Sequence, residues 1–211
     1  MIPTSSHPVS PAERKRFRRI RLCMLLSGLS VFAQLYLFQP LLSDLCSFYG
    51  ISAVTGSLSV SASTIGMAVG LFVLAFKADA VSRGRLRGPS LIASSLLTLL
   101  SVLAFNYPLL LLANFLKGAV LAGVSAVALA YLTEEVDAAV IGLAISLYLS
   151  GNTLGGMAGR VSGTLLAGWA DWHVAVLVIG AVSLLLGMIF VRLLPASRHF
   201  RPSVVSVRGK L

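Results

Sequence analysis

The sequence has few charged residues, few cysteines and few histidines. Only 11% of its 211 residues are charged, whereas an ordinary soluble domain has about 25%. This shortage excludes an intrinsically disordered chain, which needs high charge and few apolar residues, and it argues against a water-soluble enzyme. The two cysteines and three histidines are scattered, no spacing is typical of a zinc site, and there is no glycine-rich phosphate loop. We therefore expect no metal and no cofactor.

Apolar residues are abundant instead. They make up 57% of the chain, and the mean hydropathy is +0.92. A bilayer-spanning helix needs about 20 apolar residues, and six stretches approach or exceed that length. The sequence therefore predicts an all-α, polytopic membrane protein whose six-helix bundle, residues 22–194, lies between basic tails at 1–21 and 195–211. The stretches run from about Leu22 to Leu42, Val54 to Phe76, Ser90 to Phe105, Leu109 to Leu132, Ala138 to Gly168 and Val174 to Leu194.

The positive charge is confined to particular loops. The net charge is +10, which in a soluble protein would suggest a nucleic-acid partner. However, fifteen of the 17 Lys and Arg lie in three segments separated by apolar stretches, namely Arg14 to Arg21, Lys77 to Arg87 and Arg192 to Lys210. This pattern follows the positive-inside rule for a six-span protein with both termini in the cytoplasm. We favour that topology over binding to nucleic acid or to anionic lipid.

Two cations lie within apolar stretches. A charge at membrane depth costs about 2.5–3.5 kcal/mol on insertion scales and is therefore a candidate functional group. Lys117 lies in the fourth stretch, and Asn114 precedes it on the same helical face, so the two side chains can bind a polar ligand or each other. Arg160 lies in the fifth stretch, near its outer end. The alternatives are that Lys117 faces interior water without a coupling role and that Arg160 extends to the outer headgroups.

Glycines repeat every fourth residue in the fifth stretch. They are Gly151, Gly155, Gly159 and Gly163. Small residues at this spacing allow two membrane helices to approach closely. The pattern indicates either fixed helix packing or a moving contact between two bundles.

Several motifs resemble those of the major facilitator superfamily, and within it a bacterial inner-membrane branch of multidrug or sugar efflux transporters. The resemblance covers about Arg21 to Pro202, and it implies twelve spans in two six-helix bundles around a central site. The motifs are Tyr36 to Leu42, Asp79 with Arg83, Tyr131 to Glu135, Leu147 to Arg160 and Leu194 to Pro202.

The resemblance also implies roles for individual residues. Tyr36 and Gln39 join Arg160, Lys117 and Asn114 as candidates for substrate binding or coupling. The Asp79–Arg83 segment resembles the family's gating loop.

Some positions depart from the family pattern. Ala75, Ser82 and Gly84 replace consensus residues of the loop motif, and Asn114 stands where the family has a coupling Arg. Arg160 stands where the usual fifth-span motif has Pro, although the branch that the sequence resembles has this Arg too.

The chain is about half as long as the resemblance requires. The first hypothesis is therefore that it is a half-length or truncated transporter of an unknown small molecule, not an enzyme. It would act in the inner membrane with a second six-helix bundle, either a second copy or a separate C-terminal half. The second hypothesis is a non-transporting membrane relic or interaction module.

Overall fold

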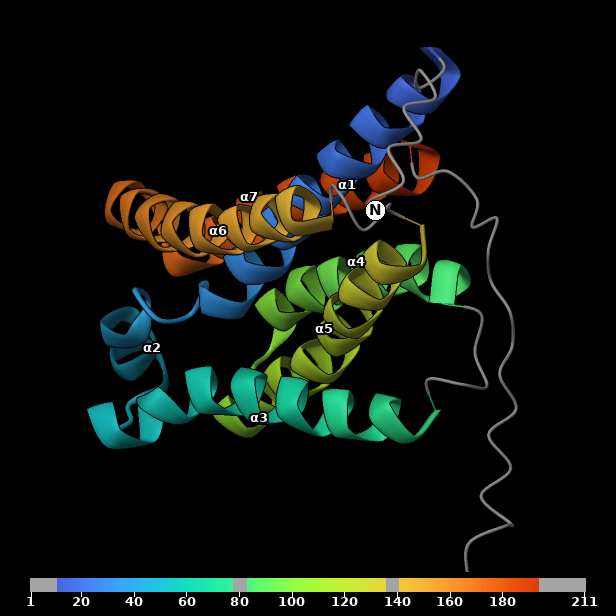
Figure 1. Ribbon diagram of the computed structural model, residues 1–211. Helices are drawn as coiled ribbons and strands as arrows, with labels where there is room; N and C mark the ends of the chain where they lie inside the picture. Colours follow the sequence, from blue (N-terminus) through green and yellow to red (C-terminus); the bar gives the residue numbers. More distant parts are fainter. Residues whose placement is uncertain (1–10, 78–82, 136–140, 194–211) are drawn as a thin grey trace, which may run out of the picture.

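The computed structural model describes residues 11–77, 83–135 and 141–193, and this part of the chain consists of helices joined by short turns, without strands (Figure 1). The helices are α1 (Pro11–Tyr36), α2 (Leu42–Tyr49), α3 (Ala53–Lys77), α4 (Arg83–Leu100), a 3₁₀ turn η1 (Ser101–Leu103), α5 (Tyr107–Glu135), α6 (Ile141–Trp169) and α7 (Trp172–Leu193).

The long helices form two groups of three. Figure 1 shows α1, α6 and α7 together on one side and α3, α4 and α5 on the other. Contacts of α7 and α1 with α4 join the groups into one bundle, and α2 links the end of α1 to the start of α3. This arrangement places the ends of α1 and α6 beside each other.

The first helix differs from the expectation at both ends. It begins at Pro11, within the segment predicted to be a tail, where proline suits a helix start. It ends at Tyr36 rather than Leu42, because Pro40 lacks an N–H and disfavours helical geometry in the residue before it. The chain turns there, with Gln39 N donating to Tyr36 O at 3.1 Å, and restarts as α2, most of which lies between the first two predicted apolar stretches.

The other five apolar stretches overlap α3 to α7, although α4 begins at Arg83 rather than Ser90 and residues 138–140 of the fifth stretch lie outside the described residues. Three windows in the described residues are long and apolar enough to cross a membrane, namely Ala53–Ala75, Tyr107–Ala126 and Trp172–Leu193, and a shorter apolar helix covers Gly88–Leu103. Helix α1 starts with basic residues, and α6 is rich in Gly, Ser and Thr, which lowers the hydropathy of both. The structure thus supports several spanning helices, and the count of six stays a prediction. The tail predicted at 195–211 lies outside the described residues.

The glycine stripe of α6 packs directly on the backbone of α1. An added methyl group at Gly151 would lie 2.5 Å from a carbonyl oxygen of α1, and one at Gly159 would lie 2.6 Å from another. Gly163 faces the ring of Pro40 just beyond α1. In this structure α1 of the same bundle covers these glycines. The choice between fixed packing and a moving contact stays a prediction. The facing carbonyls of Gly151, Gly155 and Gly159 are those of Leu25, Leu29 and Ala33, respectively.

Helices α3 and α5 pack in the same way, which the sequence analysis missed. Gly66 and Gly70 of α3 lie against the backbone of α5, and Gly118 of α5 lies against the carbonyl of Ser63. A methyl group at Gly70 would lie 2.5 Å from the carbonyl oxygen of Ala119. Such close approach is typical of small residues between membrane helices.

An aromatic cluster closes one end of the bundle, called here the aromatic end. Tyr49 of α2 donates to the carbonyl of Ala104 at 2.7 Å, and Tyr107 of α5 donates to the carbonyl of Gly56 at 2.9 Å. Trp172 is buried beside these tyrosines at 3% exposure. Trp169, at the end of α6, is exposed by contrast.

Candidate functional site

Arg160 is held by two residues from the end of α1. Its Nε donates a hydrogen bond of 2.7 Å to Oε1 of Gln39, and its guanidinium carbon lies 4.4 Å from the ring centroid of Tyr36. Gly156 leaves room for this ring, because a methyl group there would lie 3.2 Å from Tyr36 Cδ2. The sequence candidates Tyr36, Gln39 and Arg160 therefore form one cluster, and both Gln39 and Arg160 are exposed.

Lys117 and Asn114 form a second cluster, inside the bundle. Lys117 is 1% exposed, and its Nζ donates a hydrogen bond of 2.7 Å to Oδ1 of Asn114, one turn earlier in α5. The ammonium also lies 4.7 Å from the ring centroid of Phe38, a favourable cation–π arrangement. The sequence allowed Lys117 and Asn114 to bind either a polar ligand or each other, and in the structure they bind each other.

The segment that ends α1 touches both cations. Tyr36 and Gln39 contact Arg160, and Phe38 contacts Lys117. Phe38 is 1% exposed and belongs to the core cluster at the aromatic end. The sequence analysis missed its role, and an aromatic residue between two candidate polar positions was the available signal. The turn at Pro40 thus brings two cations from distant helices to one short segment.

A buried polar link between α1 and α4 was also missed. Thr98 Oγ1 donates to Oε1 of Gln34 at 3.0 Å, and Nε2 of Gln34 donates to the carbonyl of Ser30 at 3.3 Å. All three side chains are buried. Hydrogen bonds of this kind hold membrane helices together, and glutamine within the first apolar stretch was the signal. The link is satisfied internally, so it has a structural role.

The proposed gating loop falls largely outside the described residues. Asp79 is among the residues 78–82 that are not described, and of Arg83 only its place at the start of α4 is described. The role of both residues stays a prediction.

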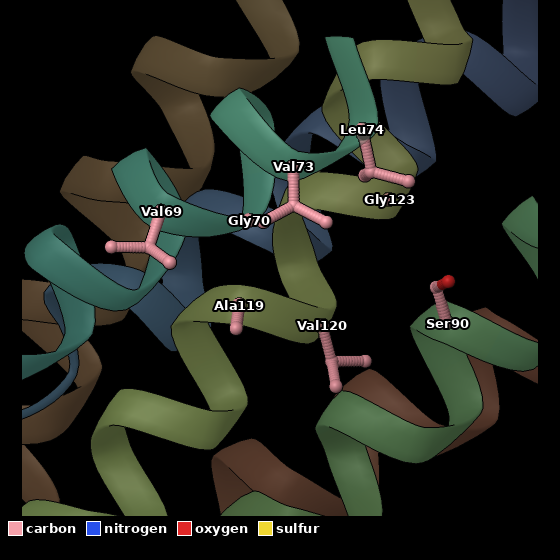
Figure 2. Close-up of a pocket in the computed structure, with 8 residues that line it drawn as sticks. All are labelled: Val69, Gly70, Val73, Leu74, Ser90, Ala119, Val120 and Gly123. Atoms are coloured by element: carbon pink, nitrogen blue, oxygen red, sulfur yellow. The ribbon is translucent and has the colours of Figure 1, made fainter. Parts of the chain in front are cut away.

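A hollow of about 320 Å³ lies between α3, α4 and α5 (Figure 2). Its lining is apolar except for Ser90, which Figure 2 shows facing Val73 and Leu74 of α3 across the gap. None of the clustered polar residues lines it. It therefore offers no hydrogen-bonding pattern for a polar solute, and the candidate site is the pair of cation clusters.

Comparison with known proteins agrees with this architecture. The Major Facilitator Superfamily model matches residues 22–210. The inner membrane transport protein YnfM of Escherichia coli (strain K12) is 36% identical over 195 residues, which are 92% of this chain and 46% of that protein. The uncharacterized MFS-type transporter YybF of Bacillus subtilis (strain 168) is also 36% identical over 195 residues, 92% of this chain and 48% of that protein.

A solved structure shows the same fold. It is a bacterial homologue of the human lysosomal transporter Spinster in an inward-facing and occupied conformation, with a TM-score of 0.76 at 19% identity. The match covers 83% of this chain and 43% of that one. The chain spans about half the length of the curated relatives it matches.

Both relatives are named as transporters. A family model that matches nearly the whole sequence, on a helical bundle with the same fold, shows that this chain belongs to the Major Facilitator Superfamily.

Proposed function

We propose that the chain is the N-terminal half of a transporter of the efflux-like branch, which carries out secondary transport or efflux of a small molecule across the cell inner membrane. The observation that carries this proposal is the convergence of Arg160 and Lys117 on the segment that ends α1. Buried or membrane-level cations are costly, and they commonly mark the path of a substrate or ion. The polar candidates Tyr36, Gln39 and Asn114 surround the same two cations.

Transport requires a second six-helix bundle. The chain matches less than half of each relative, and its exposed Arg160 and Gln39 are poorly suited to lipid. The two halves of such transporters are related by an axis along the membrane normal, so a second copy in the same orientation or a separate C-terminal half can supply the missing bundle. A strictly monomeric chain without transport activity would instead support the non-transporting relic.

Reconstitution tests the proposal. We expect the protein purified from its native membrane to have a mass above that of one 22.2 kDa chain, measured by native mass spectrometry. The same preparation in proteoliposomes is expected to exchange small solutes faster than empty liposomes. A monomer that exchanges no solute from a broad panel would contradict the proposal.

Orientation has its own test. We place both termini in the cytoplasm because the basic segments fall at 1–21, 77–87 and 192–210. Cys46 in α2 is partly exposed, whereas Cys23 is fully buried. We expect a membrane-impermeant maleimide added from the periplasm to label Cys46, with Cys46→Ser as the control. If the reagent labels Cys46 only from the cytoplasmic side, the predicted topology is wrong and both termini lie in the periplasm.

A further inference from the structure

The apolar stretches carry cations without any acidic residue. The sequence places no Asp or Glu in any of the six stretches, whereas Lys117 and Arg160 lie within them. The cost of a charge at membrane depth falls when an opposite charge lies beside it. This chain does not provide such a charge from its own spans.

The guanidinium of Arg160 has unused donors. Only its Nε has a hydrogen-bond acceptor among the described residues, Oε1 of Gln39. The ring of Tyr36 covers one face of the guanidinium, and Gln39 fixes its plane through Nε. The two terminal amino groups therefore remain for another partner, and Arg160 is exposed on the outside of the bundle. A pair of parallel N–H groups in one plane matches a carboxylate or a phosphate.

The Lys117 cluster also has unused donors. Asn114 accepts from Lys117 with its Oδ1, so its Nδ2 faces elsewhere, and this buried amide nitrogen has no acceptor in the described part of the chain. Asn114 is fully buried. Unpaired buried donors are rare and costly, because each gives up its hydrogen bonds to water. Both clusters thus have surplus N–H groups and positive charge but no anion.

We propose that Arg160, held by Gln39 and Tyr36, recognises a carboxylate or phosphate group of the transported solute. The assignment rests on the transport function proposed above and narrows the solute to an anion. The terminal amino groups of Arg160 hold the anionic oxygens, and Gln39 and Tyr36 position the guanidinium. Lys117 and Asn114 raise the positive potential on the inner side of the same segment.

On the span predicted for the fifth stretch, the position of Arg160 argues for a solute rather than a lipid headgroup. Arg160 lies nine residues before Trp169, about 13 Å along α6 at 1.5 Å per residue. Its side chain is turned towards Gln39 and Tyr36 and held there. A second copy of this chain cannot supply the anion from its spans either, because they contain no carboxylate. A mobile anion that enters from water can reach Arg160 at this position, and it does not have to come from the spans of either copy.

Binding of small aromatic probes tests the proposal. The full chain in detergent is titrated with benzoate, with phenyl phosphate and with neutral benzamide at constant ionic strength, and the thermal midpoint is recorded. We expect at least one anion to raise the midpoint saturably while benzamide does not. Arg160→Gln should lower the affinity for this anion about 10- to 100-fold, the range expected for the loss of a charge-assisted hydrogen bond. Arg160→Lys should give an intermediate loss, because an ammonium lacks the planar pair of donors.

A matched control separates the site from overall charge. Arg192 is an exposed arginine in the last turn of α7, and Arg192→Gln removes the same charge elsewhere. We expect it to bind the anion as the wild type does. Equal binding of benzamide and the anions, or equal anion affinity in wild type and Arg160→Gln, would overturn the proposal. Arg160→Lys keeps the test valid if the glutamine variant fails to fold.

Two further measurements identify other sources of the anion. If phosphatidylglycerol nanodiscs raise the midpoint through Arg160 relative to phosphatidylcholine, and the free anions do not, the partner is a lipid headgroup and the solute assignment is wrong. Loss of the larger assembly in Arg160→Gln, by native mass spectrometry, would assign the partner to a second bundle instead.

Failure of this proposal and failure of transport are distinguishable. If the protein exchanges a neutral solute at the same rate in wild type and Arg160→Gln, the transport function stands and the anion site is wrong. If the protein binds anions through Arg160 but exchanges no solute, the anion site stands and the proposed transport function is wrong.

Discussion

Nε of Arg160 lies 2.7 Å from Oε1 of Gln39, and this hydrogen bond joins residues 121 positions apart in the sequence. It links the outer face of α6 to the turn that follows α1. The turn exists because Pro40 ends α1, and the close approach of α6 exists because glycines line its contact with α1. The end of α1 and the glycine contact of α6 together therefore position the guanidinium of Arg160.

Gln39→Glu tests whether Arg160 is available to an anion. The substituted carboxylate has nearly the shape of the amide and would form an ion pair with Arg160, occupying the guanidinium. We expect the affinity for benzoate or phenyl phosphate to fall at least about tenfold, which corresponds to about 1.4 kcal/mol. The midpoint without ligand should stay the same or rise, since exposed ion pairs contribute about 0–1 kcal/mol. Gln39→Leu removes the hydrogen bond that positions Arg160 without adding a charge, so it should lower the anion affinity less than Gln39→Glu does. Unchanged anion affinity in Gln39→Glu would show that the anion binds elsewhere.

Gly155→Ala tests the contact between α6 and α1. The added methyl group would meet the carbonyl oxygen of Leu29, a backbone atom that cannot move alone. Overpacking of this kind costs about 1–3 kcal/mol, so we expect the thermal midpoint in detergent to fall. Gly142→Ala in the same helix is the matched control, because a methyl group there meets nothing within 4 Å. Alanine favours a helix over glycine, so this control should keep or raise the midpoint. Equal midpoints for both variants would contradict the packing.

The helices themselves were largely predictable from the sequence, because hydropathy is a property of each stretch alone. Both ends of α1 were exceptions, although Gln39–Pro40 carried the signal that ends a helix. The short helix α2 escaped prediction because its eight residues lie in a segment with no long apolar run.

The partners of each helix were not predictable. Gly66 and Gly70 of α3 have the same four-residue spacing as the α6 stripe, but that spacing does not say which helix they meet. Their contact with α5 emerges only when both helices are placed. The same holds for the pairing of Arg160 with Gln39 and of Lys117 with Phe38, since each joins a helix to a turn far away in the sequence. Asn114 and Lys117 were linked in advance because positions three apart share a helix face. Local periodicity thus predicts which side chains share a face, and tertiary packing decides what they meet.

Lys117 should be retained for function rather than stability. The double variant Lys117→Met, Asn114→Leu removes a fully buried charge together with its only described hydrogen-bond partner. Apolar replacements of buried charged groups are often neutral or stabilising, so we expect a midpoint at least as high as that of the wild type. Solute exchange in proteoliposomes should be lost. Lys117→Met alone is the comparison, and it should be less stable because Asn114 Oδ1 loses its donor. A double variant that exchanges solute normally would remove Lys117 from the mechanism.

Asp171 should stabilise the start of α7 in a pH-dependent manner. Its Oδ1 accepts from the backbone N–H of His173 at 3.2 Å, and its Oδ2 lies 2.7 Å from Nδ1 of the same histidine. Desolvation acts to raise the pKa of this carboxyl, but the hydrogen bonds from His173 outweigh it and hold the pKa below its ordinary value. A carboxyl whose pKa is lower in the folded state stabilises the fold fully above its unfolded pKa of about 3.9. That contribution is lost as the pH falls through the folded value.

Two substitutions separate the cap of α7 from the charge. Asn caps a helix about as well as Asp, so Asp171→Asn should lose mainly the charge, whereas Asp171→Ala should lose the cap as well and about 1 kcal/mol of stability. We expect the midpoint difference between wild type and Asp171→Asn to be constant between about pH 5 and pH 6 and to shrink below about pH 4. Differential scanning fluorimetry across this range measures it. A difference that grows as the pH falls would mean that the carboxyl is better stabilised when protonated, contrary to its bonds with His173.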